Sequence, residues 1–239
     1  FEMGMRGFGE ISMLTHIIRP DIAVITNIGI SHIERLGSRQ NILKAKLEIL
    51  EGMSRDGIVV LNGDDELLSG LRGLLPHKTV FYGINEGQDV WALDLSSKGE
   101  KGVSFQVQTP EREMNLFIPA PGVHNVYNAL PGIAVAEILH MNEREIESGL
   151  LGYSAQQLRV GIEERDGVKF INDSYNAAPS SVKAALDILC DIGSGKRKWA
   201  VLGDMLELGD WAIDAHKEIG RLVSAYGIEY LIGIGDLAR

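Results

Sequence analysis

The sequence predicts an α/β protein: a domain built on a mostly parallel sheet, with a small antiparallel meander, is followed by part of a Rossmann-like α/β domain. Two observations predict this class. Strand-like and helix-like segments alternate over most of the 239 residues, which favours parallel sheets covered by helices. From about Val90 to Ile118 the alternation stops, and short strand-like segments follow one another with only turns between them, as in an antiparallel meander.

The first part of the chain supplies the predicted parallel strands. Asp21 to Ile28, DIAVITNI, is a continuous β-branched run, as expected of a strand that is buried on both faces. Apolar residues with helical spacing then predict a helix over Gln40 to Met53. The pattern continues with strands over Gly57 to Asn62 and Lys78 to Gly83, and with a helix over Leu67 to Leu75.

After the meander, the sequence predicts helices over His124 to about His140 and over Asn142 to Leu151. We place a domain boundary near Ser154, which divides the chain into residues 1–154 and 155–239. The second part alternates again and ends one strand into a pattern that should continue. Its predicted elements are a strand-like stretch over 159–173, a helix over 180–191, a strand over 198–204, a helix over 213–226 and a strand over 229–235.

Composition and charge exclude several classes of protein. A hydrophobic fraction of 45% excludes wholesale disorder. The net charge of −10 argues against a nucleic-acid partner held through its phosphate backbone. The single cysteine, Cys190, excludes an internal disulfide and a cysteine-based zinc site. No apolar stretch approaches the roughly 20 residues that span a bilayer, and there is no signal peptide. We therefore expect a cytoplasmic protein with no membrane partner.

Two glycine-containing stretches are candidates for phosphate binding, and neither has a complete motif. GSGKRK, Gly193 to Lys198, has Cys190 in place of the first glycine of a phosphate loop and Arg197 in place of its hydroxyl residue, so we expect a solvated turn. GIGDLA, Gly233 to Ala238, fits the dinucleotide fingerprint G-x-G-x-x-A after a strand, but no following helix or acidic residue supports it.

Polar residues that follow the predicted strands are more informative, because ligands of open α/β sheets bind beyond the carboxyl ends of the strands. The same residues can also have purely structural roles instead of binding a ligand. Asparagine and aspartate commonly cap helices, and on composition alone Lys44 and Lys46 would be surface charges. Capping accounts for Asp173 or Ser174, but not for five polar residues in a row. The polar groups are Asn27, Ser31 and His32; His124, Asn125 and Asn128; Asn172 to Asn176; and Asp204 with Glu207.

The order of these stretches resembles that of the Mur ligases. The matching stretches are EMGMRGFGEI, PDIAVITNIGISHIERLGS, AKLEI, PGVHNVYNAL, NDSYNAAPSSVKAAL and LGDMLELGD, which run from Glu2 to Gly209 in the order of the family. The resemblance implies a central ATPase-like domain over residues 1–154 and part of a C-terminal Rossmann-like domain over residues 155–239. Because the chain begins with Phe1 and lacks the family's phosphate loop, we expect a piece of a longer protein that is inactive alone.

The resemblance implies an ATP-dependent, ADP-forming ligase of peptidoglycan precursor synthesis. GEI, HIERLGS, DSYNA and GDMLELG are most similar to the members that add D-alanyl-D-alanine to UDP-N-acetylmuramoyl-tripeptide. ATP would convert the substrate carboxylate into an acyl phosphate, with Mg²⁺ neutralising charge on the phosphates, and we expect a monomer. Two alternatives stay open: a non-catalytic nucleotide-binding module, and an ATP-dependent amino-acid ligase related to folylpolyglutamate synthetase.

The resemblance also implies roles for individual residues of the first part. Glu2 and His32 match the Mg²⁺ site of the family. Lys46 matches the lysine that the family carbamylates, a change that turns a repelling ammonium into an anionic oxygen ligand. Asn125 matches the residue that reads adenine, because an amide can pair with N6 and N7 of that base. Asn128 would join this nucleotide site.

In the second part, Arg159 and Asp173 match positions near the ATP phosphates and ribose. With Lys46 and His32, they would take part in catalysis. The resemblance also implies that Tyr175 and Asn176 bind substrate.

Two residues depart from the family pattern. Ala178 replaces an asparagine, so one polar contact near the substrate would be lost. Pro131 replaces an alanine inside the predicted helix, where it would remove a hydrogen bond and introduce a kink.

Overall fold

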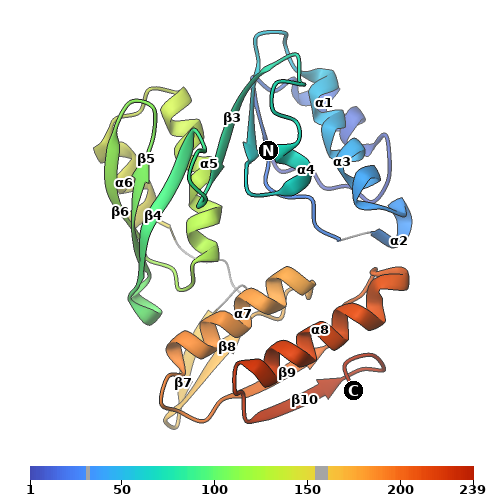
Figure 1. The fold of residues 1–239 in the computed structure, drawn as a ribbon, viewed down its shortest axis with the longest axis vertical. Coiled ribbons are helices and arrows are strands. Elements are labelled where there is room, and N and C mark those ends of the chain that lie inside the picture. Colours follow the sequence, from blue (N-terminus) through green and yellow to red (C-terminus); the bar gives the residue numbers. More distant parts are fainter. Residues whose placement is uncertain (31–32, 154–160) are drawn as a thin grey trace.

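The computed structural model describes residues 1–30, 33–153 and 161–239, which form two α/β units (Figure 1). The first unit comprises the described residues up to 153, and the second comprises residues 161–239. The predicted boundary near Ser154 lies outside the described residues and stays a prediction. Within the described ranges, no helix has the length and apolar character needed to cross a bilayer.

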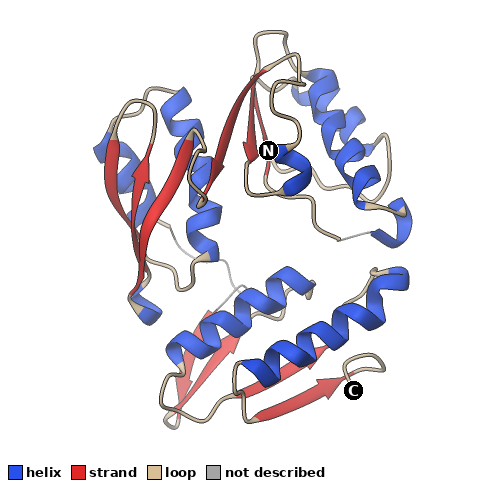
Figure 2. Ribbon diagram, viewed as in Figure 1, coloured by secondary structure: helices blue, strands red, loops and turns tan. Residues whose placement is uncertain are grey.

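One six-stranded sheet organises the first unit, in the order β1-β2-β3-β4-β5-β6 (Figures 1 and 2). β1 to β4 pair in parallel, whereas β4, β5 and β6 pair antiparallel. The predicted parallel sheet and the predicted meander are therefore confirmed, and the pairing of β3 with β4 joins them into one sheet. The strands are β1 (Ile22–Ile25), β2 (Ile58–Asn62), β3 (Lys78–Gly83), β4 (Val90–Ser97), β5 (Val103–Gln108) and β6 (Glu113–Ile118).

β2 is buried on both faces, as its continuous apolar sequence predicts. Val60 packs in the apolar cluster of the meander and α5, whereas Val59 and Leu61 pack in the cluster that includes α2 and α3. Helices therefore cover both faces of the parallel part of the sheet. The helical elements are α1 (Glu10–Ile18), α2 (Ile33–Leu36), α3 (Arg39–Leu47), η1 (Glu48–Gly52), α4 (Glu66–Ser69), η2 (Gly99–Lys101), α5 (His124–Ile138) and α6 (Glu143–Leu151).

The helix predicted over Leu67 to Leu75 is wrong in length. α4 comprises only four residues, and turns follow it up to β3. Gly73 has a φ of 70°, in the left-handed region that an α-helix does not use. Pro76 then excludes a helical continuation, because its ring removes a backbone N–H.

The helix predicted over Gln40 to Met53 is α3 followed by the 3₁₀ turn η1. Here the chain passes close to α1, which the predicted elements did not include. A Cβ atom on Gly52 would lie 2.3 Å from the carbonyl oxygen of Thr15 in α1, so this approach requires glycine.

The second unit has two small sheets beside two helices (Figure 1). β7 and β8 form a hairpin whose turn residues, Asp166 and Gly167, have φ values of 51° and 77°, as in a tight hairpin turn. β9 and β10 pair in parallel, which agrees with a partial Rossmann-like unit. The elements are β7 (Gly161–Arg165), β8 (Val168–Asn172), α7 (Pro179–Ile192), β9 (Trp199–Gly203), η3 (Gly209–Trp211), α8 (Ala212–Ala225) and β10 (Tyr230–Ile234).

We call the interface between the described parts of the two units the seam. Contacts cross it at both of its ends. At one end, Ser97 of β4 donates a hydrogen bond of 2.5 Å to the carboxylate of Asp191, which lies in α7. At the other, the N–H of Glu34 in α2 donates to the carbonyl of Glu207 at 3.5 Å, and Ile30 packs in the apolar cluster of the second unit. The second unit is thus docked against the first along this seam.

Candidate functional site at the seam between the two units

The carboxyl ends of β1, β2 and β3 meet at the edge of the sheet where the sequence predicts a ligand. The carbonyl of Thr26, just after β1, accepts a hydrogen bond of 3.0 Å from the Asn62 amide and one of 3.3 Å from the Tyr82 hydroxyl. These bonds tie the ends of neighbouring strands together. The edge is therefore a fixed platform for the side chains that lie above it.

Lys46 reaches this platform from α3. Its Nζ donates a hydrogen bond of 2.7 Å to the carbonyl of Asn27, and the N–H of the same peptide bond, on Ile28, donates to the Asp65 carboxylate at 2.7 Å. Burial lowers the pKa of Lys46, and the negative charge of Asp65 opposes this change. Lys46 is half-buried whereas Lys44 is exposed, so the two lysines have different environments.

Asp65 was not among the predicted site residues. Its carboxylate also accepts hydrogen bonds from the backbone N–H groups of Leu67 at 3.0 Å and Leu68 at 3.2 Å, so it is the N-cap of α4. The pattern NGDDE after a buried strand is a recognisable capping signal. The bond to Ile28 is not local in sequence, however, and no short-range pattern could have indicated it.

Asn125 and Asn128 lie at the start of α5, and neither caps it. The N-cap is Val123, without a side-chain cap hydrogen bond, so the capping explanation is wrong here. Asn125 is 5% exposed; its amide donates to the carbonyl of Pro121 at 2.7 Å and accepts from the Asn128 amide at 3.4 Å. An amide has two N–H donors and two acceptor lone pairs. These two bonds leave one of each on Asn125, which is what pairing with a base edge requires.

Pro131 lies inside α5, as predicted, and the helix continues through it to Ile138. A proline there removes one intrahelical N–H donor without ending the helix.

The second unit lies against the start of α5, and Asp173 is near enough to His124 there for its charge to act on the ring. Burial lowers the pKa of His124, and the negative charge of Asp173 opposes that shift across the seam. Ile188 of α7 lies at the same place, because a Cβ atom on Gly122 would lie 2.8 Å from both the His124 ring and the Ile188 side chain. The structure thus brings Asp173 to the helix start that carries the predicted adenine site.

Asp173 and Ser174 do not cap α7. The N-cap of that helix is Ala178, and the hydroxyl of Ser181 accepts a hydrogen bond of 3.0 Å from the Ala178 N–H. The capping explanation is therefore wrong for this stretch also. Ala178, where the family pattern has asparagine, caps α7 with its backbone, whose N–H donates to the Ser181 hydroxyl.

Tyr175 and Asn176 lie in the loop between β8 and α7, beside Asp173. Tyr175 is 64% exposed, and the Asn176 side chain accepts a hydrogen bond of 2.9 Å from the N–H of Ala177. Their role in binding substrate stays a prediction.

The predicted Mg²⁺ ligands do not form a metal site in the described part of the chain. Glu2 is exposed, and Lys46 is a cation that donates to a carbonyl. No group of three or more His, Cys, Asp or Glu side chains that could hold a metal occurs among the described residues. His32 and Arg159 lie outside the described residues. Of the described residues, Glu2 and the unmodified Lys46 alone thus supply one anionic ligand, and the Mg²⁺ site stays a prediction.

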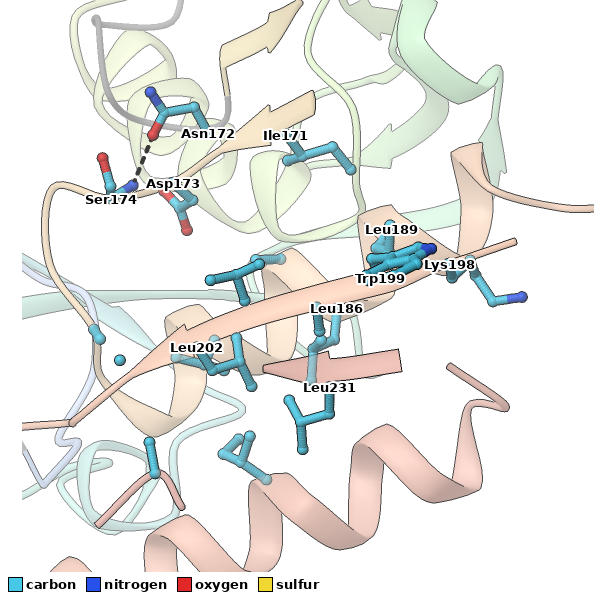
Figure 3. Close-up of a pocket in the computed structure, with 18 of the residues that line it drawn as sticks. Ile171, Asn172, Asp173, Ser174, Leu186, Leu189, Lys198, Trp199, Leu202 and Leu231 are labelled. Carbon is cyan, nitrogen blue, oxygen red and sulfur yellow. Dashed lines mark hydrogen bonds between the residues drawn. The ribbon is translucent and has the colours of Figure 1, made fainter. Parts of the chain in front are cut away.

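The second unit contains a hollow lined by β8, α7 and β9 (Figure 3). Asp173 and Ser174 lie at one end of the view and Trp199 at the other, with apolar side chains such as Leu186 and Leu202 between them. Trp199 stacks on Tyr230 with ring centroids 4.0 Å apart. The polar strand end of β8 thus borders an apolar lining.

The stretch GIGDLA is not arranged to bind a phosphate. The carboxylate of Asp204 accepts hydrogen bonds from the N–H groups of Asp236, Leu237 and Ala238 at 2.8–3.0 Å. Desolvation opposes the ionised carboxylate, but these hydrogen bonds outweigh it and lower the pKa of Asp204. Its carboxylate already occupies the N–H groups that a phosphate would need. The other glycine-containing stretch, over 193–198, is a largely exposed turn, as predicted.

The fold is that of an α/β protein of two units, with predicted site residues on both sides of the seam, and comparison with known proteins agrees with this class of fold. The family model described as the Mur ligase middle domain matches residues 1–136, and the one described as the Mur ligase glutamate ligase domain matches residues 159–239. The chain belongs to the Mur ligase family.

Individual relatives narrow the comparison. The chain is 39% identical over 237 residues to the UDP-N-acetylmuramoyl-tripeptide–D-alanyl-D-alanine ligase of Bacillus subtilis, with 99% of this chain and 50% of the relative covered. A crystal structure of MurF from Acinetobacter baumannii aligns with a TM-score of 0.91 at 30% identity, covering 98% of this chain and 51% of that one. MurF from Thermotoga maritima, in complex with ADP, aligns with a TM-score of 0.82 at 25% identity, covering 98% and 57%. The chain spans about half the length of the curated relatives it matches.

Proposed function

We propose that this chain provides the central and C-terminal parts of an ATP-dependent ligase that adds D-alanyl-D-alanine to UDP-N-acetylmuramoyl-tripeptide. The observation that carries the proposal is the seam, where Ile188 of α7 lies against Gly122 and His124 at the start of α5. The Bacillus subtilis relative named for this reaction, which matches along 99% of the chain, supports it. We also propose that the two domains meet near Ser154, with residues 1–154 central and residues 155–239 C-terminal.

The start of α5 is proposed to bind the adenine of ATP. Asn125 and Asn128 keep donor and acceptor capacity there, and an amide can pair with N6 and N7 of adenine. Asp173, and Arg159 from the same unit, are proposed to approach the ribose and the phosphates from across the seam. The ADP complex of the Thermotoga maritima relative is consistent with a nucleotide site of this kind.

The platform at the end of β1 is proposed to carry the reacting carboxylate of the tripeptide. When bound, ATP would supply the γ-phosphoryl group that converts this carboxylate into an acyl phosphate with release of ADP. The amine of D-alanyl-D-alanine would then displace phosphate from it, lose a proton and form the amide. Lys46 is held there by the carbonyl of Asn27, and its lowered pKa favours the neutral amine that CO₂ modifies. The proposed Mg²⁺ ligands are Glu2, His32 and a carbamate on Lys46. We further propose that Tyr175 and Asn176 contact the substrate, and that the seam excludes water from it.

The test is ligation by the full-length protein. ADP release should require ATP, the UDP-linked tripeptide and D-alanyl-D-alanine together, and mass spectrometry should detect the pentapeptide product. Replacing the UDP-linked tripeptide with a folate and D-alanyl-D-alanine with L-glutamate distinguishes this function from that of a folylpolyglutamate-type ligase. ATP binding without release of ADP in any of these mixtures would instead indicate a non-catalytic nucleotide-binding module.

A further inference from the structure

Asp64, just after β2, lies in a recess that holds its carboxylate from several sides. It accepts hydrogen bonds from the N–H of Ile84 at 2.7 Å, from the hydroxyl of Tyr127 at 2.9 Å and from the amide of Gln88 at 3.3 Å. Gly83 makes room for it, since a Cβ atom on that residue would lie 2.5 Å from the carboxylate oxygens. Among these partners, Tyr127 is the one that belongs to α5.

Tyr127 provides a side-chain hydrogen bond from a helix start whose N-cap provides none. The first N–H groups of a helix have no partner within the helix, and Val123, the N-cap of α5, supplies no side-chain hydrogen bond to them. Residues two apart in a helix point about 200° away from each other. Tyr127 therefore holds this turn against the sheet from the side opposite Asn125, which determines how the turn is rotated about its axis.

We propose that Asp64 and Tyr127 form a positioning pair that orients Asn125 and Asn128 toward adenine. The proposal rests on the proposed function, in which these two amides read the base. Neither member of the pair touches the nucleotide; each acts through α5. Burial, the hydrogen bond to Asp64 and the negative charge of Asp64 raise the pKa of Tyr127, so its hydroxyl remains a donor throughout the neutral pH range.

The sequence offers a matched control for the loss of a tyrosine hydroxyl. Tyr82 lies at the same edge of the sheet and packs in the same apolar cluster as α5, but its hydroxyl donates to the carbonyl of Thr26 at 3.3 Å and not to Asp64. Tyr127→Phe and Tyr82→Phe each remove one hydroxyl and leave a ring of the same shape. A general loss of stability would affect both variants, whereas misplacement of the adenine site should affect Tyr127→Phe alone.

The experiment measures binding of ADP and of inosine diphosphate to the full-length protein by calorimetry. Inosine carries a carbonyl at C6 where adenine has its amino group, so the preference for ADP reports how well the amides read the base edge. Tyr127→Phe should weaken ADP binding by roughly three- to tenfold, the range expected for one net hydrogen bond. It should also reduce the preference for ADP over inosine diphosphate, whereas Tyr82→Phe should leave both quantities within about twofold of the wild type.

Asp64→Asn keeps an acceptor oxygen for the Tyr127 hydroxyl and should fall between wild type and Tyr127→Phe. Unchanged ADP affinity in Tyr127→Phe, with a lower unfolding midpoint like that of Tyr82→Phe, would overturn the positioning role and leave the proposed function intact. If the wild type binds no adenine nucleotide, the proposed function fails and the positioning pair fails with it. The two failures are therefore distinguishable.

Discussion

The two sides of the seam hold their polar residues in different ways. In the first unit, the side chains of Lys46, Asp64 and Asp65 bond to backbone groups of other elements. In the second, the hydrogen bonds of Asn172 and Asn176 are to residues at most two positions away, and Tyr175 is 64% exposed. The first side is a preorganised platform, whereas the loop between β8 and α7 on the second side holds Asn172 and Asn176 through local hydrogen bonds. Substitutions on the first side should therefore cost stability, whereas those on the second should cost turnover.

The largest expected effect tests the second side. Asp173→Ala in the full-length protein should lower turnover by about 100-fold, the loss typical when a reacting group is misplaced by about 1 Å, because the carboxylate is proposed to hold the ribose of the nucleotide. The free energy of unfolding should change far less than turnover does, because Asp173 follows the end of β8 and lies outside the apolar cluster of the second unit. Steady-state kinetics and urea unfolding measure the two quantities. If stability collapses together with turnover, Asp173 is structural and its assignment to the nucleotide is wrong.

The second prediction concerns Lys46, which lies on the platform and should be carbamylated in the active protein. ¹³C-bicarbonate should label Lys46 in the presence of nucleotide and Mg²⁺, and Lys46→Ala should abolish the signal together with most of the turnover. Lys44 is the matched control, because it is exposed on the same helix and should remain an amine. Full activity of Lys46→Ala with no label at either lysine would remove Lys46 from the mechanism.

Asp65 tests the first side through stability. Asp65→Ala leaves the N–H groups of Ile28, Leu67 and Leu68 without their acceptor. The free energy of unfolding should fall by about 2–3 kcal/mol, the cost of an uncapped helix together with an unpaired N–H. Asp56→Ala removes an exposed carboxylate from the same unit and should change it by less than about 0.5 kcal/mol. Equal losses in the two variants would mean that the platform is not specially stabilised.

The sequence predicted the elements whose apolar pattern is uninterrupted. β3 has the predicted bounds, Lys78–Gly83, and α7 begins and ends within one residue of its prediction. α1 escaped prediction because its support is not local: its N-cap is Gly9, with a φ of 85° and no side-chain cap. Instead the N–H of Gly9 donates to the carboxylate of Glu48, 39 residues further along the chain, at 2.8 Å.

The same limit applies to the candidate site. Lys46, Asn125 and Asp173 follow from motifs that are continuous in the sequence, and the structure places them at or near the seam. Asp65 and Tyr127 could not be predicted, because the contacts that matter join residues 37 and 63 positions apart. Such contacts depend on which strand ends become neighbours in the sheet, and no pattern within a single element contains that information.

The smallest expected effect is the pH dependence contributed by His124, which lies on the seam itself. Burial lowers the pKa of His124 below 6.5, and the negative charges of Asp173 and Asp187 oppose this without reversing it. Above pH 6.5 the ring is neutral in both the folded and the unfolded protein, so it contributes no pH dependence. As the pH falls below that value, the unfolded chain takes up the proton more readily, so the free energy of unfolding decreases.

Urea unfolding at pH 7.5 and pH 5.5 should therefore show a loss of stability on acidification that is smaller in His124→Gln than in the wild type. His16→Gln, at an exposed histidine of α1, should retain the wild-type loss. Equal losses in wild type and His124→Gln would show that His124 does not titrate differently on folding. A smaller loss in the wild type than in His124→Gln would mean that attraction to the two aspartates raises the pKa of His124 by more than burial lowers it. Protonation of His124 would then stabilise the folded protein.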